Sequence, residues 1–413
     1  MSSPLRDPSS AVPNHKTTLR RAHRLMSGAL LGAVCLLSNC WTRNGSYCQI
    51  DSNCEQGLCI GYERGVKAGS CSTTLSLSSK SCKLNGIFTD SPGVNRSYGQ
   101  SVQIQPSQTQ TNVMTALIGS SAGFSYCENT RFDVRADIKD GLSNIPYGPS
   151  SRVPNANATN NWISSEPAKN NVFGISTSSG SQGSPYGNLK AAITSVSASS
   201  KWVAMGSQSA STIWLWTFAD FEQNPSFPAD IEESVTGYGR LIAVSDSQLA
   251  VGSQQDVFLY DINANNKALT NKQLIKPSGA SSSFASAIAL SALGLVVSEH
   301  EERSAGTTVW WYPPGAKEAQ TLPIPSRYLQ AGQDKVFGYG AALAASDSMI
   351  AIGVPGQGSV VVLDKTASGW QEIGISTQAV GAATRFGAAV AIDNDWLAVG
   401  APGENKVYLY LCN

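Results

Sequence analysis

Short apolar runs recur through the last three quarters of the chain, and turns rich in Gly, Ser, Asn and Asp separate them. The clearest pair of segments lies near the C-terminus, where FGYGAALAASDSMIAIGVPGQGSVVVL begins at Phe337 and FGAAVAIDNDWLAVGAPGENKVYLY begins at Phe386. Each segment opens with an aromatic residue and a glycine, and its second apolar run ends in glycine. Short runs of this composition between turn residues predict β-strands.

The same unit recurs upstream. YGRLIAVSDSQLAVGSQQDVFLY begins at Tyr238, and a more divergent copy begins at Phe284. Three further aromatic-glycine pairs precede these copies, at Tyr98, Tyr147 and Tyr186. The seven anchors are 39 to 53 residues apart, which is the size of a four-stranded propeller blade. The sequence therefore predicts an all-β protein with a seven-bladed β-propeller.

Six of the seven anchors contain a glycine, which is expected to be structural, because glycine tolerates a positive φ and a close backbone approach where the chain enters a new blade. These glycines are Gly99, Gly148, Gly187, Gly239, Gly338 and Gly387. The tryptophans on predicted strands are likewise expected to pack between blades.

The anchors and two A-[IV]-G-x-P segments, Ala351 to Pro355 and Ala398 to Pro402, resemble FG-GAP repeats. This family includes the heads of integrin α-subunits and many bacterial surface proteins. The resemblance covers residues 98–413 and is most specific in the last two repeats. It implies a binding or adhesion propeller that recognises a protein or glycan through its rim loops. The alternatives are a structural component of an envelope or surface assembly, for which Cys127 would be a docking point, and a carboxylate-dependent enzyme.

The two ends of the repeat region are complementary. The last repeat ends at Cys412-Asn413 with three predicted strands, while CKLNGIF, from Cys82, precedes the first anchor. The N-terminal strand is therefore expected to complete the final blade, so that the propeller spans residues 82–413. In that arrangement Cys412 ends the third strand near Cys82, which begins the fourth, and we expect a disulfide between them.

The N-terminal 39 residues are expected to be a targeting segment. A basic stretch precedes a 13-residue apolar run, Leu25 to Leu37, which is too short to span a bilayer comfortably and is typical of a secretory signal. The run is followed by Ser38-Asn39-Cys40, which resembles a bacterial lipobox in which Cys40 would carry the lipid, although Asn39 departs from the usual small residue. Lipid anchoring to a membrane, simple cleavage and an uncleaved anchor remain alternatives. The expected location is extracytoplasmic, in the cell envelope or secreted.

Residues 40–81 are expected to form a small disulfide module. Few apolar residues lie among their cysteines, and such a segment needs covalent cross-links that an oxidising compartment supplies. With Cys40 reserved for lipid and Cys127 left free, the cysteines expected to pair among themselves are Cys48, Cys54, Cys59 and Cys71. Zinc is disfavoured because there is no C-x2-C pair and no nearby histidine.

Charge and histidine content narrow the function classes. Lys plus Arg equals Asp plus Glu at 29 each, which disfavours nucleic acid as a partner. Two of the three histidines, His15 and His23, lie in the targeting segment and leave only His300. A site with several histidines is then excluded, and a Ser-His-Asp triad would depend on His300. We therefore expect a protein that is not an enzyme.

Two loops carry candidate binding residues. Asp393-Asn394-Asp395 is the best fragment of the calcium loop found in many FG-GAP repeats, with Asp393 and Asp395 as ligands. Related turns in other repeats are Ser245-Asp246-Ser247 and Ser346-Asp347-Ser348. Because it has only two carboxylates, a bare hairpin turn without a cofactor is the favoured interpretation. Ser298 to Arg303 contains Glu299, His300, Glu301 and Glu302, which predict a negative, cation-binding edge; the alternative is a solvated loop.

Overall fold

The computed structural model describes thirty strands and the turns that join many of them. The described residues are 47–48, 58–60, 69–72, 77–89, 98–106, 114–120, 123–128, 134–137, 150–152, 162–166, 171–175, 191–217, 220, 231–277, 280–300, 307–325, 328, 338–375 and 381–413. The chain divides into two compact units, Met1–Thr73 and Thr74–Asn413. No helix within the described residues has the length and apolar character needed to cross a membrane.

In the first unit, three strands form one antiparallel sheet in the order β1-β3-β2: β1 Tyr47–Cys48, β2 Leu58–Ile60 and β3 Gly69–Ser72. The backbone register places Cys59 opposite Cys71. The targeting segment, Cys40 and Cys54 lie outside the described residues. The pairing of the cysteines in this unit therefore stays a prediction.

The first five sheets of the second unit are antiparallel, and their neighbouring strands follow the chain order. The first two sheets contain β5 Ser101–Pro106, β6 Met114–Ser120, β7 Gly123–Glu128 and β8 Val134–Asp137, and then β9 Ser150–Arg152, β10 Trp162–Glu166 and β11 Asn171–Ile175. The next two contain β12 Ser195–Ala198, β13 Trp202–Ser207, β14 Thr212–Thr217 and β15 Ile231–Glu232, and then β16 Leu241–Val244, β17 Gln248–Gly252, β18 Val257–Ile262 and β19 Leu269–Ile275. The fifth contains β20 Phe284–Ser291, β21 Gly294–Glu299, β22 Thr308–Tyr312 and β23 Gln320–Thr321.

The remaining strands join into one eight-stranded sheet of order β24-β25-β26-β27-β4-β30-β29-β28. Their bounds are β4 Leu77–Thr89, β24 Leu343–Ala345, β25 Met349–Val354, β26 Ser359–Thr366, β27 Gly369–Ile375, β28 Ala389–Asp393, β29 Trp396–Ala401 and β30 Lys406–Cys412. Two short 3-10 helices, η4 Pro355–Gln357 and η5 Ala382–Thr384, lie beside this sheet.

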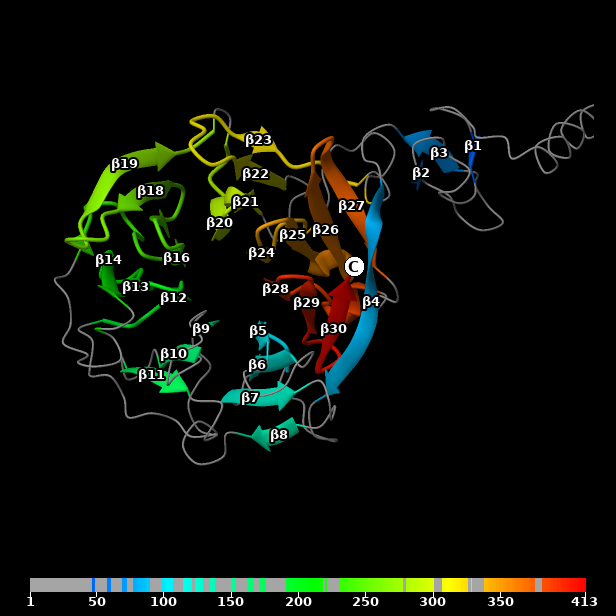
Figure 1. The fold of residues 1–413 in the computed structure, drawn as a ribbon, viewed down its shortest axis with the longest axis horizontal. Helices are drawn as coiled ribbons and strands as arrows, with labels where there is room; N and C mark the ends of the chain where they lie inside the picture. The colour runs from blue at the N-terminus through cyan, green and yellow to red at the C-terminus, as the bar shows by residue number, and fades with distance from the viewer. Residues whose placement is uncertain are drawn as a thin grey trace, which may run out of the picture. The chain divides into compact units, whose positions relative to one another are not determined.

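The sheets are arranged around a common centre (Figure 1). The first strand of each sheet contacts the first strand of the next, from β5 through β9, β12, β16, β20 and β24 to β28, and β28 contacts β5 again. The second strands β13, β21 and β25 are buried along their whole length, because sheets cover both of their faces. This arrangement confirms the expected β-propeller.

The N-terminal strand closes the ring. β4 pairs antiparallel with β30, with Cys82 opposite Cys412, and the expected disulfide joins these two buried residues. β4 begins at Leu77, so it includes the last five residues of the segment expected to be the disulfide module. Its first half pairs with β27 in parallel, and this one strand therefore connects the two halves of the eight-stranded sheet.

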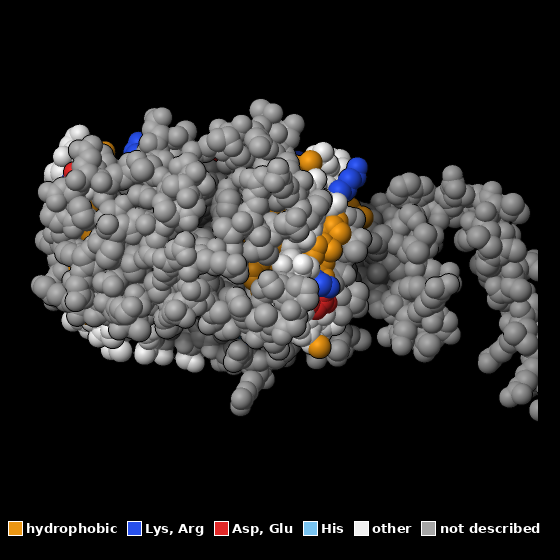
Figure 2. Space-filling model, turned by 90° about the horizontal axis from the view of Figure 1, so that it is seen from below, with side chains coloured by type: hydrophobic (Ala, Val, Ile, Leu, Met, Phe, Trp, Pro, Cys, Tyr) orange, Lys and Arg blue, Asp and Glu red, His pale blue; other side chains and the backbone are white. Residues whose placement is uncertain are grey.

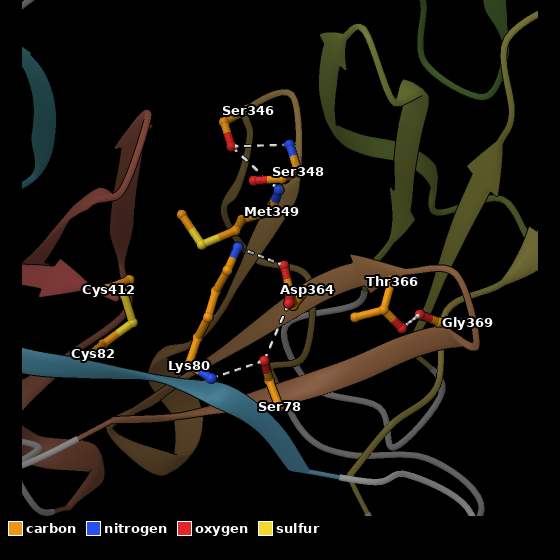
Figure 3. Close-up of polar contacts among 10 residues, drawn as sticks. All are labelled: Ser78, Lys80, Cys82, Ser346, Ser348, Met349, Asp364, Thr366, Gly369 and Cys412. Atoms are coloured by element: carbon orange, nitrogen blue, oxygen red, sulfur yellow. Dashed lines mark hydrogen bonds and ion pairs between the residues drawn. A yellow bond between two sulfur atoms is a disulfide. The ribbon is translucent and has the colours of Figure 1, made fainter.

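Side chains hold the first half of β4 against β26 (Figure 3). The Lys80 ammonium lies 3.0 Å from Asp364 Oδ1, and the Ser78 hydroxyl donates to Asp364 Oδ2 at 3.1 Å. Asp364 is only 5% exposed, so its carboxylate is largely shielded from water and depends on these two donors. The contact secures residues of β4 that precede the disulfide.

The anchor glycines pack against the neighbouring blade. A Cβ on Gly99 would lie 2.7 Å from the Lys406 carbonyl oxygen, and one on Gly387 would lie 2.2 Å from the Ser359 carbonyl oxygen. Both glycines also have a positive φ, of +90° and +91°. Any side chain would therefore strain the backbone and separate adjacent blades.

The sixth anchor is Tyr339-Gly340 rather than the expected Phe337-Gly338. Gly340 N donates to Gly353 O at 3.0 Å, which is the bond that Gly387 N makes to Gly400 O, and Tyr339 is fully buried like Phe386. The sequence FGYG contains two aromatic-glycine pairs, and only their distance from the following strand distinguishes them. Phe337 itself lies outside the described residues.

Candidate functional site

Five equivalent hairpin turns line one cavity. Each turn joins the first and second strands of its sheet, and the turns begin at Ser199, Ser245, Ser291, Ser346 and Asp393. Because the sheets surround a common centre, these turns converge at one end of the ring. They enclose a cavity of about 630 Å³, which we call the hairpin mouth.

The first residue of these turns stabilises the turn itself. Ser199 Oγ accepts from Trp202 N at 3.1 Å, Ser245 Oγ from Gln248 N at 3.0 Å, and Ser346 Oγ from Met349 N at 3.2 Å. A serine in this position satisfies a backbone donor that the tight turn would otherwise leave without a partner. The repeated serine therefore gives the hairpin mouth a fixed rim.

The second residue of the turn differs from one turn to the next. This position is occupied by Ser200, Asp246, Ala292, Asp347 and Asn394, all of which line the cavity. Burial acts to raise the pKa of Asp246, but hydrogen bonds from Ser200 and Ser199, together with the charge and backbone N–H of Lys201, outweigh it, so the pKa lies below its ordinary value. Asp246 is accordingly a stable anion at neutral pH, which suits binding of polar or cationic groups better than proton donation.

The two proposed calcium ligands have different surroundings. Asp393 is 8% exposed and lines the hairpin mouth, where it stands in the place of the turn serine. Its Oδ1 accepts from the side-chain amide of Asn394 at 3.2 Å. The backbone oxygen of Asp395 accepts from Cys412 N at 2.7 Å, which ties this turn to the end of the chain. Within the described ranges, no three His, Cys, Asp or Glu residues come together as a group that could hold a metal ion.

Glu299 and His300 lie at the other end of the strands. Glu299 is 5% exposed, and its carboxylate accepts from Ser281 N at 2.9 Å and from the Trp310 indole nitrogen at 3.3 Å. This carboxylate therefore belongs to the interior of its own blade and not to an exposed negative edge. His300 lines a second cavity together with Arg385. Glu301 and Glu302 lie outside the described residues.

Sequence reasoning identified the turns at Asp246 and Asp347 but did not bring them together with Asp393. Their shared position in the repeat was the available signal, since equivalent turns of a propeller face the same end. Sequence reasoning missed Arg385, because this residue directly precedes the Phe386-Gly387 anchor and the repeat pattern alone accounted for the local sequence.

On the face in Figure 2, basic and acidic side chains are both visible, and they lie beside a group of hydrophobic side chains. This mixture agrees with the equal numbers of acidic and basic residues in the chain, 29 each.

Comparisons with known proteins find the fold but no family. No protein-family model matches the chain, and no curated protein matches it in sequence. The chain is similar in structure to Kuenenia stuttgartiensis hydrazine synthase, with a TM-score of 0.54 and 12% identity over 78% of this chain and 98% of that chain.

Two further solved structures agree with this result. The chain resembles the structure of U3-55K, with a TM-score of 0.56 and 9% identity over 80% of this chain and 99% of that one. It also resembles the RRP9 WD40 repeats, with a TM-score of 0.56 and 9% identity over 81% of this chain and 99% of that one. At these identities the likeness concerns the fold alone, and it supports a β-propeller.

Proposed function

We propose that the chain is an exported, FG-GAP-like propeller of seven blades that binds a protein or glycan at the hairpin mouth and catalyses no reaction. The observation that carries this proposal is the convergence of five equivalent turns on one cavity of about 630 Å³. Ligand sites of this size are common, and loops on a rigid scaffold are frequent binding elements.

The blade count is supported by the contacts between first strands. They run from β5 through five intermediate strands to β28 and return to β5. Each of these strands begins a sheet or one end of the eight-stranded sheet. Counting one blade per first strand gives the seven units that the anchors predict.

A second candidate is hydrolysis by a pair of carboxylates, because Asp246, Asp347 and Asp393 line the same cavity. Such chemistry needs one carboxyl group with a raised pKa to act as the acid. The lowered pKa of Asp246 argues against that role for this residue. Turnover of a panel of aryl glycosides that disappears in Asp347→Asn would establish this candidate in place of the binding module.

Export is supported by the basic and apolar N-terminal segment and by the buried Cys82–Cys412 disulfide. Disulfides persist mainly in oxidising compartments. Intact-mass analysis of membrane and soluble fractions tests this part of the proposal and reports whether Cys40 carries a lipid. We expect a chain that has lost its leader and is oxidised; a full-length, fully reduced chain would contradict export.

Two alanine-to-tryptophan variants test the binding site. Ala292 is exposed at the tip of a turn in the hairpin mouth, whereas Ala367 is exposed in the outer turn between β26 and β27. Ala292→Trp should fill the cavity and abolish binding to surface proteins and glycan arrays, while Ala367→Trp should bind like the wild type. Equal binding by both variants would remove the hairpin mouth from the proposal, and a wild type that binds neither ligand class would refute the function.

A further inference from the structure

A second cavity, of about 560 Å³, lies at the opposite ends of the same strands. Its described lining consists of His300, Arg385 and small residues such as Gly338, Gly356 and Ala388. His300 follows the end of β21, whose first residue, Gly294, lines the hairpin mouth. Arg385 and Ala388 precede β28, whose last residue, Asp393, does so as well. We call this second space the basic cavity.

The carboxylate nearest in sequence to His300 does not face the basic cavity. Glu299 is buried and is held by Ser281 N and the Trp310 indole. The described lining therefore contains no acidic side chain. Of the four residues expected to form a cation-binding edge, His300 lines this cavity, Glu299 does not, and Glu301 and Glu302 lie outside the described residues; the described lining adds Arg385.

The backbone of His300 is fixed on both sides. Its N–H donates to Ser286 Oγ at 3.1 Å, and the same hydroxyl donates to its carbonyl oxygen at 2.9 Å. The imidazole consequently extends from an ordered segment, which lowers the entropy that binding must overcome.

Arg385 is presented in a similar way. It has a positive φ of 51°, and its N–H donates to Ala382 O at 3.1 Å. Arg385 is exposed, and within the described part of the chain no side-chain hydrogen bond or ion pair engages its guanidinium. A guanidinium in this state can offer two parallel N–H groups to an incoming oxyanion.

The wall of the basic cavity is built from closely packed backbone. Gly338 and Gly356 line the cavity, and a Cβ on Gly338 would lie 2.9 Å from Gly356 N. Next to the lining, a Cβ on Gly358 would lie 2.3 Å from the Gly381 carbonyl oxygen. These contacts connect the segments on either side of the cavity. The space therefore exists before a ligand arrives, and its volume exceeds that of a single inorganic ion.

We propose that the basic cavity binds a small molecule through its oxyanion group, a carboxylate or a phosphate, between the Arg385 guanidinium and the His300 imidazole. This site is separate from the hairpin mouth and does not depend on the partner proposed there. The two ends of the ring then have opposite preferences, with aspartates at one end and donors for an anion at the other.

Titration calorimetry of the full chain with inorganic phosphate and with succinate, in Tris chloride at low salt, tests this inference. We expect saturable one-to-one binding of at least one of these probes, and the tighter one distinguishes phosphate from carboxylate. Arg385→Gln should weaken that binding by about tenfold, the effect of losing one charge-assisted hydrogen bond, and Arg385→Lys should weaken it less.

The matched control is Lys201→Gln, which removes an exposed cation from a hairpin turn at the other end of the ring. It should leave the affinity unchanged. Equal unfolding temperatures of the variants and the wild type show that the fold is retained. Absence of binding by both probes, or equal weakening by Arg385→Gln and Lys201→Gln, would overturn the proposal.

Discussion

Gly400 offers a sharp test of how the ring closes. It lies in β29, and a Cβ at this position would be 2.1 Å from the Gly99 carbonyl oxygen, which belongs to the segment that leads into β5. Gly99 is itself held by a hydrogen bond from its N–H to Gly119 O at 3.0 Å. The clash is therefore with fixed backbone and not with the end of a flexible side chain.

Gly400→Ala must push the first and last sheets of the ring apart. A real Cβ does not approach another atom closer than 3.0 Å, so the two backbones have to separate by most of an ångström. Overpacking of this kind costs about 1–3 kcal/mol, and the gain from replacing a flexible glycine offsets only about 0.5–1 kcal/mol. We expect a net loss of about 1 kcal/mol in the free energy of unfolding.

The matched control is Gly374→Ala in β27. A Cβ there meets no atom within 4 Å, and the glycine does not have a positive φ. This variant should be as stable as the wild type or slightly more stable, because only the entropy of the unfolded chain changes. Urea unfolding followed by tryptophan fluorescence gives both free energies. If the two variants unfold with free energies within about 0.5 kcal/mol of each other, the described contact between Gly400 and Gly99 does not exist in solution.

Two further perturbations follow from buried polar groups. Tyr312 is 4% exposed, its hydroxyl has no described hydrogen-bond partner, and burial raises its pKa to about 12. In the unfolded chain this tyrosine ionises near pH 10, so the free energy of unfolding should fall as the pH rises from about 10 to 12. Tyr312→Phe should reduce this fall by up to about 1 kcal/mol per pH unit, measured by urea unfolding at each pH. If the free energy of unfolding depends on pH in the same way in the variant and the wild type, the raised pKa does not belong to Tyr312. Asp364→Asn weakens the contacts with Lys80 and Ser78, so amide hydrogen exchange should accelerate in residues 77–81 of β4 but not in its second half, and uniform acceleration would show that β4 is not divided in this way.

The ring and its closure could be predicted from the sequence because both depend on the number of repeats and on the number of strands in each repeat. A last repeat with three predicted strands requires a fourth, and the segment at Cys82 was the available candidate. The parallel pairing of Leu77 to Cys82 with β27 was not foreseen, because this segment appeared to belong to the cysteine-rich module. Parallel pairing with a neighbouring strand produces no pattern in the sequence that would distinguish it.

The candidate site was predicted less completely than the fold. The turns at Asp246, Asp347 and Asp393 were recognised one by one, but their convergence follows from the ring geometry and not from any local motif. For Glu299 the sequence was misleading in another way. A run of acidic residues suggests an exposed edge, but Glu299 is the last residue of a strand, and its side chain points to the buried face. Burial of a charged residue with two donors can be found only from the structure.

The claim that β4 completes the last blade can be tested directly by peptide mapping of the oxidised protein. A protease digest analysed by mass spectrometry without reductant should contain one cross-linked species that joins the peptides of Cys82 and Cys412 and separates on reduction. A linkage between Cys82 and a cysteine of residues 48–71, or a Cys412 that is alkylated without prior reduction, would contradict this closure of the ring.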